Sequence, residues 1–222
     1  TQFGEGEDYG RYPRTLESDL ERLLEEECDL VFVPDNATMY PHEGEHAVKL
    51  LAAPALASTL EGEFRPGHFD GVVTVVARLF NLVAPDIAVF GEKDYQQLLV
   101  IRRLVSDLGY PIRIVAVPTV READGLAMSS RNQYLAATRR EAARRLNEVL
   151  RSAREQISAG IAFSRVEIEA RRRLESAGFE VDYVAARTAD ELAVPGPEDR
   201  NIRVLAAARC GPTRLIDNLS VN

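Results

Sequence analysis

Residues 87–117, IAVFGEKDYQQLLVIRRLVSDLGYPIRIVAV, decide the fold. Two short apolar runs, Ile87 to Phe90 and Ile112 to Val117, have the length and composition of buried strands. Between them, Tyr95 to Leu108 carries apolar residues at helical spacing and stops before Gly109, a residue type that commonly ends helices. A strand, a helix and a strand joined by short connections predict a parallel pair with a crossover helix.

Toward the N-terminus the same alternation continues. Thr15 precedes leucines at positions 16, 20, 23 and 24, which predicts an amphipathic helix with Thr15 as its N-cap. Cys28 to Val33 (CDLVFV) predicts another buried strand that ends at Pro34, and Gly71 to Val83, which is apolar on nearly every side, predicts a buried helix. We therefore expect an α/β fold with a parallel sheet and helices on both of its faces.

The predicted helix 71–83 carries one polar stripe, formed by Thr74, Arg78 and Asn81. These positions follow the helical spacing of i, i+4 and i+7. The stripe could face a functional site, a partner subunit or a buried polar network, and the sequence does not decide between them.

The pattern changes near residue 120. Two helices rich in arginine and glutamate are predicted at 137–159 and 164–177, separated by Gly160. Three short strands follow at 180–185, 202–207 and 214–217, with glycine and proline between them. We expect a first domain over 1–120 and a smaller α+β domain with an antiparallel sheet over 121–222.

Composition excludes several classes of protein. The 222 residues carry a formal net charge of −8, which argues against a nucleic-acid-binding protein because such proteins present a basic surface. No apolar run has the length of a membrane helix, and no secretory signal pattern is present. Cys28 and Cys210 match no metal-binding spacing and are typical of free thiols in a reducing cytoplasm. The chain opens on Thr1 rather than methionine, which suggests that its start has been lost.

The first candidate site is the segment Phe90 to Gln97, where a predicted strand ends and a helix begins. Ligands of open α/β sheets bind beyond the carboxyl ends of the strands, and a helix N-terminus favours phosphate. Lys93 is one of only two lysines, beside Lys49, against 25 arginines. Its retention favours a phosphate contact over a solvated loop, with Asp94 available to a ribose hydroxyl or a metal ion and Gln97 one turn further on.

Two further segments are weaker candidates. Met128 to Asn132 (MSSRN) places two hydroxyls and a guanidinium in a row, which suits an anion. Taken alone, a serine-capped turn explains it better. In Arg65 to Gly71 (RPGHFDG), His68 is as readily a helix-capping residue as an anion ligand or proton carrier.

A zinc-like pattern, His42 to His46 (HEGEH), is a poor metal site. Zinc ligation through H-E-x-x-H requires both histidines on one helix face. Here Pro41 precedes the pattern and Gly44 lies inside it, so no helix is expected. We predict a solvated loop there and assign no metal ligands.

Taken together, the motifs resemble one family. They are, in chain order, Arg11-Tyr12-Pro13-Arg14-Thr15, Arg65-Pro66-Gly67-His68-Phe69, Phe80-Asn81-Leu82-Val83, Pro85-Asp86, Phe90-Gly91-Glu92-Lys93-Asp94-Tyr95-Gln96-Gln97, Ser129-Ser130-Arg131-Asn132-Gln133-Tyr134-Leu135 and Leu215-Ile216-Asp217-Asn218. This set resembles the pantothenate synthetases (pantoate–β-alanine ligases), along the whole chain. The resemblance implies a Rossmann-like nucleotidyltransferase domain, ATP and Mg²⁺ as co-substrate and metal, a pantoyl-adenylate intermediate, a cytoplasmic location and a homodimer.

The resemblance also implies residue roles. Lys93 and Arg131 would act as catalytic residues. ATP would be bound by Gly91, Glu92, Lys93, Asp94, Val120, Met128, Ser129, Ser130 and Arg131. Gln2 and Gln97 would bind pantoate, and Gln2 would also border the β-alanine site. Arg65 and His68 are weaker candidates near the site.

The family's first nucleotide signature, with its His-x-Gly-His, is expected upstream of Thr1. On this expectation residues 1–222 lack part of the catalytic site. Three alternatives follow: another adenylate-forming enzyme of the same superfamily, a zinc hydrolase built on His42 and His46, and an inactive fragment or interaction domain.

Overall fold

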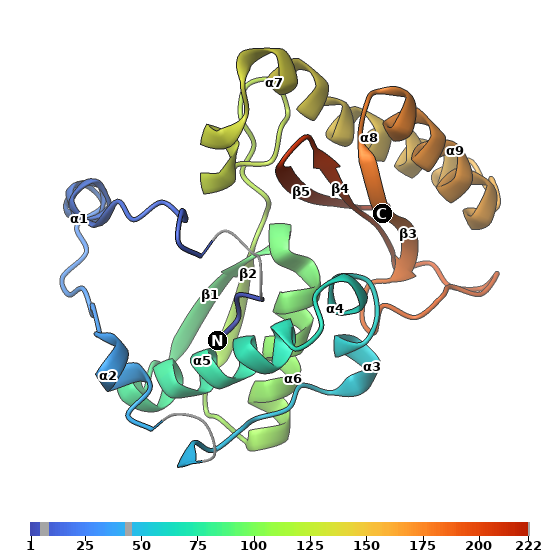
Figure 1. Ribbon diagram of the computed structural model, residues 1–222. Coiled ribbons are helices and arrows are strands. Elements are labelled where there is room, and N and C mark those ends of the chain that lie inside the picture. Colours follow the sequence, from blue (N-terminus) through green and yellow to red (C-terminus); the bar gives the residue numbers. More distant parts are fainter. Residues whose placement is uncertain (5–8, 43–45, 222) are drawn as a thin grey trace.

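The computed structural model describes residues 1–4, 9–42 and 46–221, and these residues form two sheets (Figure 1). The first is a parallel pair, β1 (Ile87–Gly91) and β2 (Arg113–Val117), with Ile87 opposite Arg113. The second is antiparallel, in the order β3 (Glu180–Thr188), β4 (Ile202–Cys210) and β5 (Thr213–Ser220). The predicted parallel pair, its crossover helix and the antiparallel sheet are all confirmed.

The first half holds most of the short helices. Their bounds are α1 (Leu16–Glu25), α2 (Asn36–Met39), α3 (Pro54–Ala57), α4 (Glu61–Phe64), α5 (His68–Val83), the 3₁₀ turn η2 (Glu92–Asp94) and α6 (Tyr95–Leu108). Helix α6 has the predicted bounds, because Gly109 takes the left-handed conformation (φ 64°) that ends a helix at little cost. Thr15 stands at the N-cap of α1, but its hydroxyl donates to Asp19 instead of capping a backbone amide.

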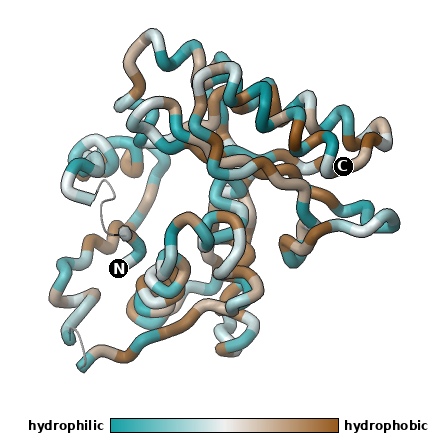
Figure 2. Tube along the Cα trace, turned by 45° about the vertical axis from the view of Figure 1, so that its right-hand side comes forward, coloured by the Kyte–Doolittle hydropathy of each residue, from teal (hydrophilic) through white to brown (hydrophobic). Residues whose placement is uncertain are grey.

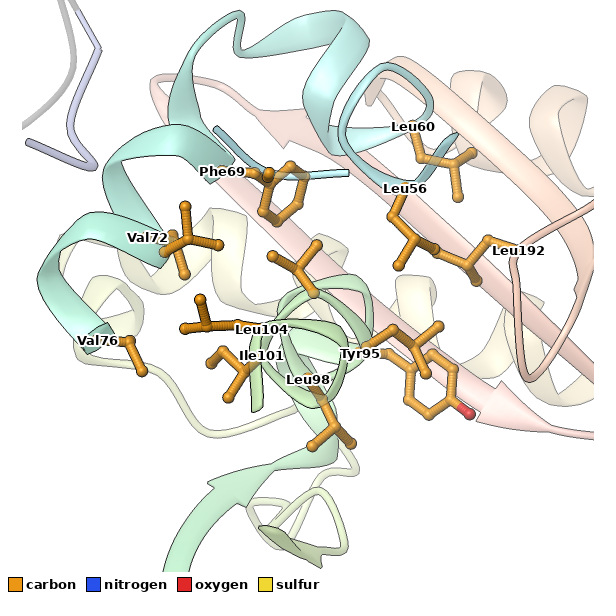
Figure 3. Packing of buried hydrophobic residues seen from close by; sticks show 14 of the residues in the cluster. Leu56, Leu60, Phe69, Val72, Val76, Tyr95, Leu98, Ile101, Leu104 and Leu192 are labelled. Atoms are coloured by element: carbon orange, nitrogen blue, oxygen red, sulfur yellow. The ribbon is translucent and has the colours of Figure 1, made fainter. Parts of the chain in front are cut away.

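Helices α5 and α6 share one hydrophobic core (Figure 3). Phe69, Val72 and Val76 of α5 point toward Ile101 and Leu104 of α6. Leu56 and Leu60 from the α3–α4 segment, together with Leu192 from the loop after β3, close the same cluster. Residues from both halves of the chain are therefore buried together.

Two expectations about the parallel sheet are wrong. Ala88 and Phe90 of β1 pack against the core of α5 and α6, whereas Ile87 and Val89 are 46% and 60% exposed. Both helices cover the same face, so among the described residues this sheet is not covered on both sides and β1 is only half buried.

The segment Cys28 to Val33 is not a buried strand. It forms no strand, and Leu30 and Phe32 are 89% and 51% exposed. In Figure 1 it runs between α1 and α2, apart from β1 and β2. A strand requires a hydrogen-bonding neighbour, and none of the described strands lies beside this segment.

The second half is built from η3 (Ser130–Tyr134), α7 (Ala137–Ala143), α8 (Arg145–Ser158), α9 (Phe163–Ser176) and the antiparallel sheet. The single helix expected over 137–159 is divided at Arg144. In Figure 2, teal and brown alternate along α8 and α9, as expected for amphipathic helices that lie on a sheet.

Alternate side chains of β5 pack on the two opposite faces of its sheet. Leu215 and Leu219 belong to the core formed with α8 and α9, whereas Ile216 packs against the core of α5 and α6. Arg214 and Asn218 contact Glu61 and the η2 turn, on the same side as Ile216. This alternation follows the two-residue period of a strand.

The polar stripe of α5 does not line the cavity described below. Thr74 donates to the carbonyl of Asp70 within the helix, at 2.7 Å, and Arg78 donates to the carbonyl of Thr38 in α2 at 2.9 Å. None of the helices in the described part of the chain is long and apolar enough to cross a membrane.

Candidate active site

A cavity of about 750 Å³ lies where the two halves of the chain meet. Lys93 and Asp94 line it from the η2 turn, and Ser129 and Arg131 line it from the segment around η3. The two segments singled out from the sequence therefore share one cavity, of a size that accommodates a small-molecule ligand.

The η2 turn places Lys93 and Asp94 at the carboxyl end of β1. Gly91 ends the strand in an extended conformation, and a Cβ atom added there would meet nothing within 4 Å, so its backbone is open to a ligand. Glu92 turns away: its carboxylate pairs with Arg203 at 3.2 Å. Gly91 and Glu92 belong to the same turn but do not line the cavity.

The segment around η3 is fixed by its own polar side chains. Ser129 accepts a hydrogen bond from the backbone N–H of Arg131 at 3.3 Å, so it caps η3 and also lines the cavity. Asn132 is buried, and its amide donates to Glu122 Oε1 at 2.6 Å and to the carbonyl of Ala127 at 3.1 Å. An ion pair and hydrogen bond from Arg140 lower the pKa of the Glu122 carboxyl. The serine-capped turn is therefore present and also lines the cavity, while anion binding by this segment stays a prediction.

A strap formed by residues 9–14 lies against this segment. Ser130 Oγ donates to the phenol oxygen of Tyr12 at 3.0 Å, and the Arg131 guanidinium lies 5.5 Å from the centre of the Tyr12 ring. Tyr134 donates through its hydroxyl to the carbonyl of Arg11. Tyr12 and Tyr134 stand within the quoted sequence motifs, but no role was predicted for either of them.

His68 connects Arg65 to the first residues of the chain. Its Nδ1 lies 2.7 Å from the carbonyl oxygen of Gln2, and its Nε2 lies 3.0 Å from Arg65 Nη1. A carbonyl only accepts and a guanidinium only donates, so a neutral imidazole with its proton on Nδ1 satisfies both contacts. Gln97 lines a second hollow of about 30 Å³ together with Arg65, His68 and Lys93. Gln2 and Gln97, far apart in sequence, therefore both lie close to His68.

Val120 and Met128 lie together but do not line the cavity. The N–H of Met128 donates to the carbonyl of Val120 at 2.9 Å, and the side chains of Met128 and Val120 are 52% and 60% exposed. Their adenine-side role stays a prediction.

The zinc-like pattern falls partly outside the described residues. His42 and His46 are exposed, and positions 43–45 between them are not described. The described residues contain no group of three histidine, cysteine, aspartate or glutamate side chains that could hold a metal ion.

A buried ionic cluster forms the wall of the cavity. Arg214 of β5 donates to both oxygens of Glu61, at 2.6 and 2.8 Å, and its Nε donates to Asp182 at 2.7 Å. Tyr183 donates to Glu61 at 2.8 Å. Burial acts to raise the pKa of Glu61, but the hydrogen bonds and charge of Arg214 outweigh it, so this pKa lies below its ordinary value.

This cluster was not predicted from the sequence, because its members lie up to 153 residues apart. A glutamate in a short helix and an arginine in a predicted strand carry no local signal of pairing. Burial raises the pKa of the Tyr183 phenol, and the negative charge of the neighbouring Glu61 raises it further.

Comparisons with known proteins give a consistent result. Residues 1–220 match the family model described as pantoate-beta-alanine ligase. Pantothenate synthetase of Xanthomonas axonopodis pv. citri is 54% identical over 220 residues, covering 99% of this chain and 78% of that protein. That of Methylococcus capsulatus is 49% identical over 223 residues, covering 100% of this chain and 78% of that protein.

Solved structures agree in fold. Pantothenate synthetase from Thermus thermophilus superimposes with a TM-score of 0.93 at 47% identity, covering 99% of this chain and 79% of that one. Pantoate-beta-alanine ligase from Francisella tularensis, solved with an ATP compound and β-alanine, gives a TM-score of 0.81 at 32% identity. The match covers 100% of this chain and 76% of that one. With the parallel sheet, the second antiparallel sheet and the cavity between them, these matches show that the chain belongs to the pantoate–β-alanine ligase family.

Proposed function

We propose that the cavity binds ATP and pantoate for the ligation of (R)-pantoate to β-alanine, which releases AMP and pyrophosphate through a pantoyl-adenylate. One observation carries the proposal: Lys93 and Asp94 line the same cavity as Ser129 and Arg131, although the two pairs come from different halves of the chain. Family membership supplies the reaction, and this geometry supplies a place for it.

Lys93 and Arg131 are the proposed catalytic residues. The pantoate carboxylate attacks the α-phosphorus of ATP in line, and negative charge grows on the phosphoryl oxygens and the departing pyrophosphate. These two cations, which line the cavity from different halves of the chain, stabilise that charge electrostatically. The β-alanine amine then attacks the acyl carbon of the mixed anhydride, AMP leaves and the amine loses a proton. No protein nucleophile is required.

The other residues singled out from the sequence have supporting roles in this proposal. We propose that Ser129 and Ser130 bind the phosphates together with Lys93 and Arg131, and that Asp94 lies near the ribose. Gly91 and Glu92 contact ATP at the end of β1, and Val120 and Met128 face the adenine. Gln2 and Gln97 bind pantoate, and Gln2 also borders the β-alanine site. Arg65 and His68 order this region through the contact of His68 with Gln2.

Mg²⁺ fits the donors at this place. Magnesium in nucleotide sites is held by substrate phosphates and one or two carboxylates rather than by a dedicated protein cage. Asp94 lines the cavity beside Lys93 and offers one such carboxylate, as the alternative to its contact with the ribose. When bound, the ion would neutralise charge on the phosphate oxygens.

We also propose a homodimer, a cytoplasmic location and a division into a domain over 1–120 and a smaller domain over 121–222. The dimer and the location rest on the family resemblance, and the division rests on the change of sequence pattern near residue 120. Sedimentation equilibrium tests the dimer, and a monomer at micromolar concentration would contradict it.

The site is tested by pantoate-dependent exchange of labelled pyrophosphate into ATP, with the full-length gene product. Lys93→Ala should lower the exchange rate about 10²-fold or more, the range found for single electrostatic donors. Lys49→Ala is the matched control, because Lys49 is the only other lysine and is exposed. Wild-type exchange in Lys93→Ala would exclude the proposed role. Exchange that depends on an acid other than pantoate would instead favour a different adenylate-forming enzyme.

A further inference from the structure

A buried side-chain amide from β5 holds the turn that carries Lys93. Asn218 Nδ2 donates to the backbone carbonyl of Glu92 and to that of Lys93, each at 2.9 Å. Asn218 is only 3% exposed and lies 125 residues away from Lys93 in the sequence. One amide group from the second half of the chain therefore fixes two consecutive peptide groups of η2.

The orientation of this amide is itself fixed by Arg203. Arg203 Nη1 donates to Asn218 Oδ1, and Arg203 Nη2 pairs with Glu92 Oε2 at 3.2 Å. The guanidinium lies 3.7 Å from the centre of the Tyr95 ring, which restrains it from the other side. Since only the nitrogen of an amide donates and only its oxygen accepts, this arrangement is satisfied in one orientation alone.

Asn218 is itself held in place by strand pairing and by the contacts of Asp217. It pairs with Leu205 in the β4–β5 ladder, and its backbone N–H donates to Asp217 Oδ1 at 2.7 Å. Asp217 is held by two hydrogen bonds from Arg121, at 2.8 and 2.9 Å, and by one from Asn147 at 3.1 Å. The backbone position of Lys93 is thus fixed relative to β5, the strand at one edge of the antiparallel sheet.

We propose that Asn218 is a positioning residue for the reaction: it acts through Lys93, by fixing the η2 backbone so that the ammonium group meets the phosphates. The inference rests on the proposed role of Lys93. Electrostatic stabilisation of a transition state requires the charged group to be held within about 0.5 Å of its productive place. Misplacement by about 1 Å can cost about 10²-fold in rate. Two hydrogen bonds from a buried amide restrain the backbone from which the Lys93 side chain extends, and so narrow the region that its ammonium group can reach.

The test is a double-mutant cycle in the pyrophosphate exchange assay. Asn218→Ala removes both donors and should lower kcat about 10- to 100-fold, while the KM for pantoate changes less than about threefold. In the Lys93→Ala background the same substitution should cause less than about a threefold further loss, because the group it positions is already gone. Equal losses in both backgrounds would overturn the proposal and leave Asn218 with a structural role only.

Asn201→Ala is the control. Asn201 is an asparagine whose side-chain amide donates to Asp190 at 3.2 Å, outside the set of contacts that leads from Asp217 to η2. It should leave kcat within about threefold of wild type, and a loss equal to that of Asn218→Ala would overturn the proposal. If Asn218→Ala does not fold, as judged by thermal melting, Asn218→Asp replaces it. That variant keeps the acceptor for Arg203 and loses both donors, so the same cycle applies.

Two failures are distinguishable in this cycle. If Lys93→Ala exchanges pyrophosphate at the wild-type rate, the proposed function of the turn fails and the positioning role fails with it. If Lys93→Ala loses activity and Asn218→Ala is additive with it, the positioning role alone fails.

Discussion

Ser130 donates a 3.0 Å hydrogen bond to the phenol oxygen of Tyr12, across 118 residues of sequence. The Arg131 guanidinium lies over the same ring. Two side chains that we assign to the triphosphate are therefore engaged by the strap of residues 9–14. A nucleotide that uses Ser130 and Arg131 must exchange these contacts for its own.

Tyr12→Phe should therefore tighten nucleotide binding. The substitution keeps the ring and removes the acceptor of the Ser130 hydrogen bond, a contact worth about 0.5–1.5 kcal/mol. The Kd of a non-hydrolysable ATP analogue should fall about two- to tenfold in isothermal titration calorimetry. Tyr9→Phe is the control. Tyr9 also belongs to the strap, but its ring contacts Phe3 and Arg14 rather than the segment around η3. Weaker binding by Tyr12→Phe would show that the hydroxyl supports the bound state instead.

Gly71→Ala should weaken pantoate binding without destabilising the protein. A Cβ atom at position 71 would lie 2.3 Å from the carbonyl oxygen of Thr1 and 2.6 Å from the Cα of Gln2. The first two residues must then move, although alanine is the better helix former. We expect the KM for pantoate to rise about tenfold, which corresponds to the loss of about one hydrogen bond. ATP affinity should stay within about twofold of wild type, because the substitution lies apart from the proposed phosphate contacts.

Gly10→Ala controls for this change, because a Cβ atom at Gly10 meets nothing within 4 Å. An unchanged KM for pantoate in Gly71→Ala would remove the support for Gln2 as a pantoate ligand. A large drop in melting temperature would show instead that helix α5 itself is disturbed.

Glu61→Gln should destabilise the fold at neutral pH. Arg214 would keep its contact with Asp182 but lose the charge of Glu61, to which it donates two hydrogen bonds, and such a loss costs about 1.5–3 kcal/mol. Urea unfolding at pH 7 measures the loss. Glu141→Gln, which removes the exposed partner of Arg144, should change the free energy of unfolding little.

The effect of Glu61→Gln should shrink in acid. The pKa of Glu61 is lower in the folded protein than its ordinary value of 4.5, so the unfolded state binds the proton more readily. The stabilisation is complete above pH 4.5 and is lost as the pH falls toward the folded-state pKa. The free energies of unfolding of wild type and Glu61→Gln should therefore converge below about pH 4.5. A constant difference down to about pH 3 would contradict this assignment.

The two halves should unfold together. Leu205 and Ala207 of the antiparallel sheet belong to the same core as Leu98 and Ile101 of α6. This core and the Glu61–Arg214 pair both contain residues from 1–120 and from 121–222, so neither part can unfold without disrupting the other. Calorimetry should therefore record one transition with equal calorimetric and van't Hoff enthalpies. Two separate transitions would show that 1–120 and 121–222 are thermodynamically independent.

Local signals predicted the elements whose causes are local. The bounds of α6 follow from its apolar spacing and from Gly109, and both are visible in a window of about 15 residues. The apolar run Cys28 to Val33 looks the same as a buried strand in such a window. Whether it pairs depends on what lies beside it, and that is a tertiary property.

The sequence predicts several residues that line the cavity, such as Lys93, Ser129 and Arg131, but it does not predict the side chains that hold them in place. Lys93 stood out because lysine is scarce, and Ser129 and Arg131 through their motif. The contacts from Tyr12 to Ser130 and from Asn218 to Lys93 join segments 118 and 125 residues apart. No spacing rule within one segment encodes them, so they became visible only when the fold brought the strands and turns together.

The turn between β4 and β5 is only two residues long, and this length fixes the register of β5. Cys210 pairs with Thr213, so Gly211 and Pro212 are the whole connection, and Gly211 takes a positive φ of 64°. One inserted residue would slip β5 by a single position and send Asn218 to the opposite face of its sheet. Surface turns commonly tolerate insertions, but the length of this one sets which face of the sheet Asn218 occupies, and therefore whether its amide reaches η2.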